Sequence, residues 1–129
     1  MQDQPTPAEI VGAVAAFLKE VVAAETQGAV SFQARVAANA LEIVRRQLDL
    51  APAEESRELE RLRALLGHDG ALAELNAELA LGIRDGRLDL STPGLKEHLW
   101  ATTLAKVAVD QPNYSGYRAA LAERLGAKD

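Results

Sequence analysis

Apolar residues recur at helical spacing along most of this chain, and residues that start or stop helices bound each run. In the first run they share one wide arc at about 100° per residue. Its members are Ile10, Val11, Val14, Phe17, Leu18, Val21 and Val22. Thr6 and Glu9 form a capping-box pattern around Pro7, and proline is favoured at the first helical position. The pattern predicts a helix that begins at Pro7 and ends before Gly28.

Five further runs predict five further helices. Ser31 can cap a helix that continues to about Asp49, and Pro52 is expected to break the chain and open the next helix. Asp69 is expected to cap the fourth helix, and Thr92 with Pro93 opens the fifth. The predicted ranges are 31–49, 52–66, 70–84 and 93–110, with a short last helix from about 115.

The composition agrees with helices rather than with a sheet. The 25 alanines and 19 leucines supply most of the apolar residues, whereas aromatic residues make up only 4%. Alanine and leucine favour helices, and a sheet needs more β-branched and aromatic residues. We expect an all-α fold: a compact bundle of five to six helices with no sheet. The whole chain, 1–129, is expected to be one helical domain, with residues 1–6 as a flexible N-terminal arm.

The apolar arcs also predict a core. The residues expected in it are Ile10, Val14, Phe17, Leu18, Val21, Val36, Ile43, Val44, Leu62, Leu66, Leu75, Leu79, Trp100, Leu104 and Val107. The fifth helix is apolar on two sides, with Trp100 and Leu104 on one and Leu95 and Leu99 nearly on the other. Such a helix lies either at the centre of its own bundle or at an interface with a partner.

Charge and targeting signals limit the partners. The net charge is −5 and the pI is about 5.1, which argues against nucleic acid or an anionic membrane surface. The absence of cysteine excludes disulfides and thiolate sites. The most apolar segment, Ile10 to Ala24, is interrupted by Lys19 and Glu20 and is too short to span a bilayer. No signal peptide is recognisable, so we expect a cytoplasmic protein with no membrane partner.

Catalytic motifs are missing, and the candidate site residues are few. The carboxylate pair Glu54 and Glu58, like Glu74 with Glu78, fits solvated surface charge better than a metal site or an acid–base pair. His68 lacks the glutamate three residues earlier that a di-iron helical site requires. We therefore assign no catalytic residue, no metal site and no cofactor, and we leave enzymatic activity open while favouring its absence.

Two helix faces carry polar lines that could bind a ligand. Arg35 and Asn39 lie at i and i+4, where they could clamp a carboxylate or a phosphate, although an edge-of-core stripe is the better explanation of them. His98 heads a second polar line and could act as an acid or base, or could be hydrogen-bonded between packed helices. Tyr114 follows the fifth helix and could anchor the last helix or line a pocket. The candidate ligand-binding residues are Arg35, Asn39, His98 and Tyr114.

Three segments resemble a small, all-helical, uncharacterised bacterial family of unknown function. They are residues 2–7 (QDQPTP), 32–39 (FQARVAAN) and 112–117 (PNYSGY), and the similarity spans nearly the whole chain. Members of that family are often encoded beside acyl-CoA dehydrogenases and aminoglycoside-phosphotransferase-like kinases. The resemblance implies a connection with acyl-CoA or small-molecule catabolism, and it supplies no catalytic residues.

We therefore expect a non-catalytic helical accessory protein that forms a homodimer and works with a partner enzyme of acyl-CoA metabolism. Its expected self-association surface includes the fifth helix and Leu81 of the fourth, which lies opposite the apolar side of that helix. The alternative is a protein that binds a small anion or acyl carboxylate, or a minor enzyme, with a pocket near Arg35, Asn39, His98 and Tyr114.

Overall fold

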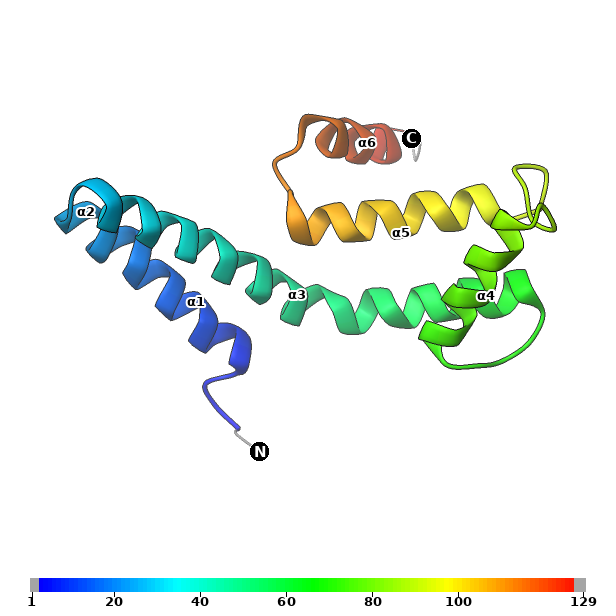
Figure 1. The fold of residues 1–129 in the computed structure, drawn as a ribbon, viewed down its shortest axis with the longest axis horizontal. Coiled ribbons are helices and arrows are strands. Elements are labelled where there is room, and N and C mark those ends of the chain that lie inside the picture. Colours follow the sequence, from blue (N-terminus) through cyan, green and yellow to red (C-terminus); the bar gives the residue numbers. More distant parts are fainter. Residues whose placement is uncertain (1–2, 127–129) are drawn as a thin grey trace. The chain divides into compact units, whose positions relative to one another are not determined.

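The computed structural model describes residues 3–126 of the chain and the side chains as far as Glu123. The described residues are helical and contain no strand, so the all-α prediction is confirmed (Figure 1). In chain order, the elements are α1 (Pro7–Phe17), the π-helical stretch η1 (Leu18–Val22), α2 (Ala23–Glu25), α3 (Gly28–Leu66), α4 (Leu72–Arg84), α5 (Leu95–Asp110) and α6 (Ser115–Gly126).

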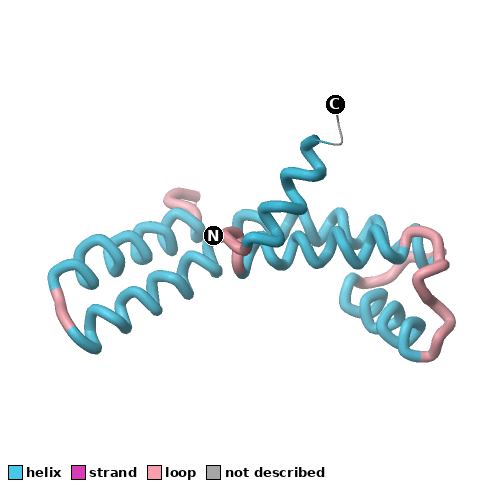
Figure 2. The backbone as a smooth tube through the Cα atoms, turned by 90° about the horizontal axis from the view of Figure 1, so that it is seen from above, coloured by secondary structure: helices cyan, strands magenta, loops and turns pink. Residues whose placement is uncertain are grey.

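The chain forms two compact units, Met1–Ala51 (unit 1) and Pro52–Asp129 (unit 2). In unit 1, α1 and the first part of α3 are antiparallel neighbours joined by η1, α2 and a short turn, as Figures 1 and 2 both show. In unit 2, the second part of α3 is followed by α4, α5 and α6. The expectation of a single domain over 1–129 stays a prediction.

The predicted start of α1 is confirmed by its hydrogen bonds. The Glu9 backbone N–H donates to Thr6 Oγ1 at 3.2 Å, and the Thr6 N–H donates to Glu9 Oε2 at 2.6 Å, which completes the capping box. These hydrogen bonds lower the pKa of the Glu9 carboxyl, and the bond from the Thr6 backbone N–H has the largest effect. Pro7 occupies the first turn, where its missing N–H costs nothing.

Unit 1 packs through small residues, and the core predicted for it is wrong. Its buried residues are Ala15, Ala23, Ser31, Ala34 and Ala38. Of the predicted core residues in this unit, Leu18 is half-buried. The others are 36–56% exposed: Ile10, Val14, Phe17, Val21, Val36, Ile43 and Val44. Small side chains let the two helices approach closely, and Ser31 Oγ donates to the Ala23 carbonyl at 2.7 Å across the turn. The large apolar side chains consequently point outward.

The predicted break at Pro52 is also wrong, because α3 continues from Gly28 to Leu66 with Pro52 inside it. Proline has no N–H to donate to the Leu48 carbonyl, and its ring crowds the preceding turn, which usually kinks or ends a helix. Here the residues on both sides keep the helix going, and Pro52 instead coincides with the boundary between the two units.

Unit 2 packs around leucines, as predicted. Leu62, Leu75, Leu79 and Leu95 form its buried cluster, and Leu59, Leu65, Leu66, Leu72 and Leu88 pack against it. Leu104 is buried as well, whereas Val107 is half-buried. Trp100 is 55% exposed, so its predicted place in the core is wrong. Helix α5 turns the side that carries His98 and Leu95 inward, and on the other side Leu104 is buried while Trp100 is exposed.

The start of α4 differs from the prediction. The residue before the helix is Ala71, not Asp69, and the Ala71 N–H donates to the Glu74 carboxylate at 3.4 Å. Asp69 binds Arg63 Nε at 2.6 Å and accepts a bond from the Gly70 N–H, so it closes the turn between α3 and α4. These bonds lower the pKa of Asp69, the Gly70 N–H contributing most.

Candidate functional site

The four predicted ligand-binding residues are divided between the two units. Arg35 and Asn39 lie on α3 in unit 1, and both are exposed. His98 lies on α5 in unit 2 and is only 2% exposed, whereas Tyr114, in the turn before α6, is 58% exposed. From His98 to Asp110 at the end of α5 is about 18 Å at 1.5 Å per residue. Within unit 2, His98 and Tyr114 therefore do not form one site.

His98 belongs to a polar cluster inside unit 2. Arg61 Nη2 on α3 donates to Thr102 Oγ1 on α5 at 3.4 Å, and Asn76 Nδ2 on α4 donates to Glu58 Oε1 at 2.8 Å. His98 Nδ1 and Arg61 Nε are buried without a hydrogen-bond partner among the described residues. Burial and then the Arg61 charge lower the pKa of His98, and the Glu58 charge opposes them. The protonated form of this imidazole is therefore disfavoured, and its side chain is only 2% exposed.

The polar cluster is therefore suited to linking helices rather than to catalysis. A general base must reach the proton that it abstracts, and a buried imidazole without solvent contact offers no such access. Glu58 was expected on the solvated surface, yet both Glu58 and Arg61 are half-buried. Glu58 lies four residues before the buried Leu62, on the same side of α3, and this spacing was the signal that could have placed it inside.

Tyr114 lines a separate hollow of about 230 Å³ at the end of α5, together with Val107, Asp110 and Gln111. Its backbone N–H donates to the Gln111 carbonyl at 2.9 Å. A Cβ added to Gly116 would lie 2.7 Å from Tyr114 Cε1, so the ring covers that glycine. Tyr114 thus contacts the start of α6 and also borders the hollow, and both roles considered for it stay predictions.

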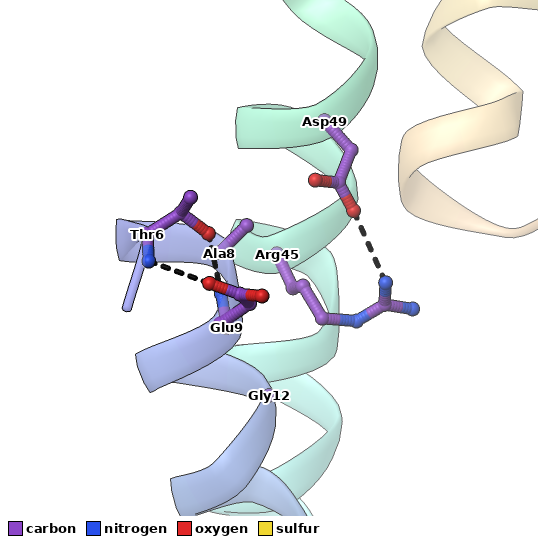
Figure 3. Close-up of a pocket in the computed structure, with 6 residues that line it drawn as sticks. All are labelled: Thr6, Ala8, Glu9, Gly12, Arg45 and Asp49. Carbon is purple, nitrogen blue, oxygen red and sulfur yellow. Dashed lines mark hydrogen bonds and ion pairs between the residues drawn. The ribbon is translucent and has the colours of Figure 1, made fainter. Parts of the chain in front are cut away.

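A second hollow, of about 370 Å³, lies between α1 and α3 of unit 1 (Figure 3). Its lining residues are Thr6, Ala8, Glu9, Gly12, Arg45 and Asp49. Arg45 was not predicted. It binds Glu42 at 3.0 Å and Asp49 at 3.1 Å, and the hydrogen bond to Glu42 is the main reason that the pKa of Arg45 is raised. Since these carboxylates already neutralise the guanidinium, an anionic ligand gains little here.

The surface of unit 1 is its most distinctive feature. On α1 and the π-helical stretch η1 that continues it, four exposed apolar residues recur at intervals of four, three and four: Ile10, Val14, Phe17 and Val21 of η1. We call them the α1 stripe. On α3, four exposed apolar residues share one line along the helix: Phe32, Val36, Ile43 and Leu50. We call these the α3 stripe. Both stripes lie away from the alanines that join the two helices, as residue spacing along a helix requires.

Comparison with known proteins gives one match. Residues 24–114 match the DUF6285 domain of unknown function, and the chain belongs to that family. No curated protein and no solved structure matches the chain. Among the described residues, no group of three or more metal-ligating side chains is gathered, and no helix is long and apolar enough to cross a membrane.

Proposed function

We propose that this member of the DUF6285 family is a non-catalytic, cytoplasmic interaction protein. Its unit 1 docks through the α1 stripe on a partner enzyme of acyl-CoA or small-molecule catabolism. One observation carries the proposal: Ile10, Val14, Phe17 and Val21 are 38–56% exposed, although their spacing is that of a packed helix face. A monomeric soluble protein rarely leaves an apolar patch of this kind uncovered.

The residue spacing of the α1 stripe indicates that the partner binds it in a hydrophobic groove that accepts a helix. An amphipathic helix binds in a hydrophobic groove through apolar side chains at positions such as i, i+4, i+7 and i+11. Each side chain that becomes fully buried contributes about 1.5–3 kcal/mol. Phe17 is the largest and most exposed of the four, so we expect it to be the anchor.

The class of partner rests on the resemblance described above. Residues 32–39 and 112–117 resemble a family encoded beside acyl-CoA dehydrogenases and aminoglycoside-phosphotransferase-like kinases, and neighbouring genes often serve one pathway. The alternative, a pocket that joins Arg35, Asn39, His98 and Tyr114, has less support, because His98 is buried and the Tyr114 hollow lies at the far end of α5.

A direct binding experiment tests the proposal. A purified acyl-CoA dehydrogenase, of the class encoded beside members of the family that this chain resembles, is titrated with the full-length chain, and the heat of binding is measured. We expect saturable binding that Phe17→Glu abolishes, because the substitution would bury an unpaired charge. Leu90→Glu, at a 79% exposed position of unit 2, is the matched control and should bind normally. Binding that is absent, or that Phe17→Glu leaves unchanged, would overturn the proposal.

A further inference from the structure

The α3 stripe has the spacing of a coiled-coil seam. From Phe32 the intervals of four and three residues lead to Val36, Asn39, Ile43, Arg46 and Leu50. Hydrophobic residues in a four-three alternation face a partner helix and insert as knobs into its holes. The part of α3 in unit 1, residues 28–51, is 24 residues long, or about 36 Å and just over three heptads. The occupant of this seam is therefore a helix.

We propose that this helix is α3 of a second copy of the chain, parallel and in register. In that arrangement each seam residue meets its own equivalent: Phe32 packs on Phe32, Val36 on Val36, and Ile43 on Ile43. Asn39 then meets Asn39, and each amide can donate one hydrogen bond and accept another. Other registers would place each amide against an apolar side chain without a hydrogen-bond partner, so the Asn39 pair favours this register at some cost in stability. In an antiparallel pair, Asn39 would face Ile43 instead.

The charges beside the seam favour the same arrangement. Arg35 and Glu42 occupy the positions just before Val36 and Ile43, and across a parallel pair they face Ala40 and Gln47. No like charges oppose each other along these flanks. An antiparallel pair would place Glu42 against Glu42. Within the seam, Arg46 meets Arg46 of the second copy, and this like-charge contact lowers the stability of the pair. Arg46 is half-buried, and each side chain can lay its aliphatic stem along apolar surface and turn its guanidinium to the opposite edge of the pair.

The area agrees with a stable pair. A strip about 36 Å long and one helix diameter of about 10–12 Å wide gives about 400 Å² in projection for each copy. The two copies together give about 800 Å² in projection, and the accessible area of interdigitating side chains exceeds the projection. The total therefore lies toward the lower end of specific interfaces, which begins at about 1,200 Å². The buried residues Ala34 and Ala38 on the other side of α3 keep α1 out of this surface.

Single-cysteine variants of the full-length chain test the pairing, because the natural sequence has no cysteine. Val36→Cys and Ile43→Cys should each form disulfide-linked dimers on mild oxidation, since a parallel pair brings each residue to its own equivalent. Ala37→Cys, one residue further along α3 and exposed, is the matched control and should stay unlinked. Far-ultraviolet circular dichroism checks that each variant is folded.

Two further variants test the role of the seam. Asn39→Leu should tighten dimerisation about tenfold or more, because it replaces a polar pair by an apolar one. Val36→Glu should weaken it at least about tenfold, because it buries two like charges. Folded cysteine variants that remain unlinked would overturn the pairing. The pairing would also be overturned if disulfides formed only between an Asn39→Cys chain and an Ile43→Cys chain, because that cross-link indicates an antiparallel pair. Neither result affects binding through the α1 stripe.

Discussion

Unit 1 and unit 2 are both helical, but they use their apolar residues in opposite ways. Unit 2 buries leucines, with Leu62, Leu75, Leu79 and Leu95 at its centre, whereas unit 1 buries alanines and one serine. Among the described side chains, eleven of the eighteen large exposed apolar residues belong to unit 1, although it is the shorter unit. Hydrophobic stabilisation scales with buried apolar area, so unit 2 has its own core, whereas unit 1 leaves most of its large apolar side chains uncovered.

The largest difference should appear when a leucine of unit 2 is truncated. Leu62 is completely buried, so Leu62→Ala should lower the free energy of unfolding by about 2–5 kcal/mol. Phe17→Ala, at a residue of unit 1 that is more than half exposed, should change it by about 0.5 kcal/mol or less. Urea titrations followed by circular dichroism measure both. Equal losses for the two variants would mean that Phe17 is a core residue after all.

Enlarging a residue between the helices of unit 1 should have the next largest effect. Ala38 is buried where α3 faces its own unit, so Ala38→Leu should lower the free energy of unfolding by about 1–3 kcal/mol through overpacking. The neighbouring Ala37→Leu is exposed and serves as control, with little expected change. Thermal melting of both variants checks this. If Ala38→Leu is as stable as the natural chain, the two helices leave room for a larger side chain at Ala38 and are not closely packed there.

Removal of the α1 cap should cost less. Thr6→Ala removes the acceptor for the Glu9 N–H and should lower the free energy of unfolding by about 0.5–2 kcal/mol. Thr103→Ala, at an exposed threonine whose hydroxyl donates to the Leu99 carbonyl inside α5, is the control and should have a smaller effect. Chemical denaturation distinguishes them. Should the control lose more than Thr6→Ala, the capping box would not be what holds the start of α1.

The smallest expected effect is a pH dependence within unit 2. Burial lowers the pKa of His98 in the folded chain, whereas the unfolded chain titrates near its usual value of about 6.5. As the pH falls through that value, the unfolded chain gains a proton that the folded chain does not bind. Stability should therefore be complete above about pH 6.5 and decline below it.

His68 acts in the opposite direction. Its hydrogen bond to the Asp69 carbonyl, and then its contact with Glu78 at 2.9 Å, raise its pKa, so its contribution is present at low pH and is lost as the pH rises through the folded value. Urea midpoints between about pH 5 and 8 separate the two histidines. His98→Gln should remove the decline at low pH, and His68→Gln should steepen it. An unchanged slope in His98→Gln would refute the assignment.

The helices and the core of unit 2 could be predicted from the sequence, whereas the core of unit 1 could not. Amphipathic spacing identifies a helix and its apolar face, as it did around Thr6 and at Leu62, Leu75 and Leu79. The same spacing does not say whether that face is covered by the chain itself or by another chain. Alanines carry no such signal, because they occur on every side of these helices.

The candidate site residues show the same limit. Glu58 and Arg61 resemble solvated charges in the sequence, and only the packing of α4 and α5 against α3 shows that they are half-buried beside His98. Pro52 predicted a break by its own chemistry, but continuity of a helix depends on the residues around it. Asn39 was singled out for its side-chain chemistry, and its place in a four-three seam gives it a different role, which we propose above.

The mass of the protein in solution tests most directly whether unit 1 is completed by another chain. Sedimentation equilibrium at micromolar concentrations measures it without assumptions about shape. We predict twice the chain mass of 13.8 kDa for the natural protein and a shift toward a single chain mass for Val36→Glu. A natural chain that sediments at 13.8 kDa at every concentration, with unit 1 fully folded, would contradict the account.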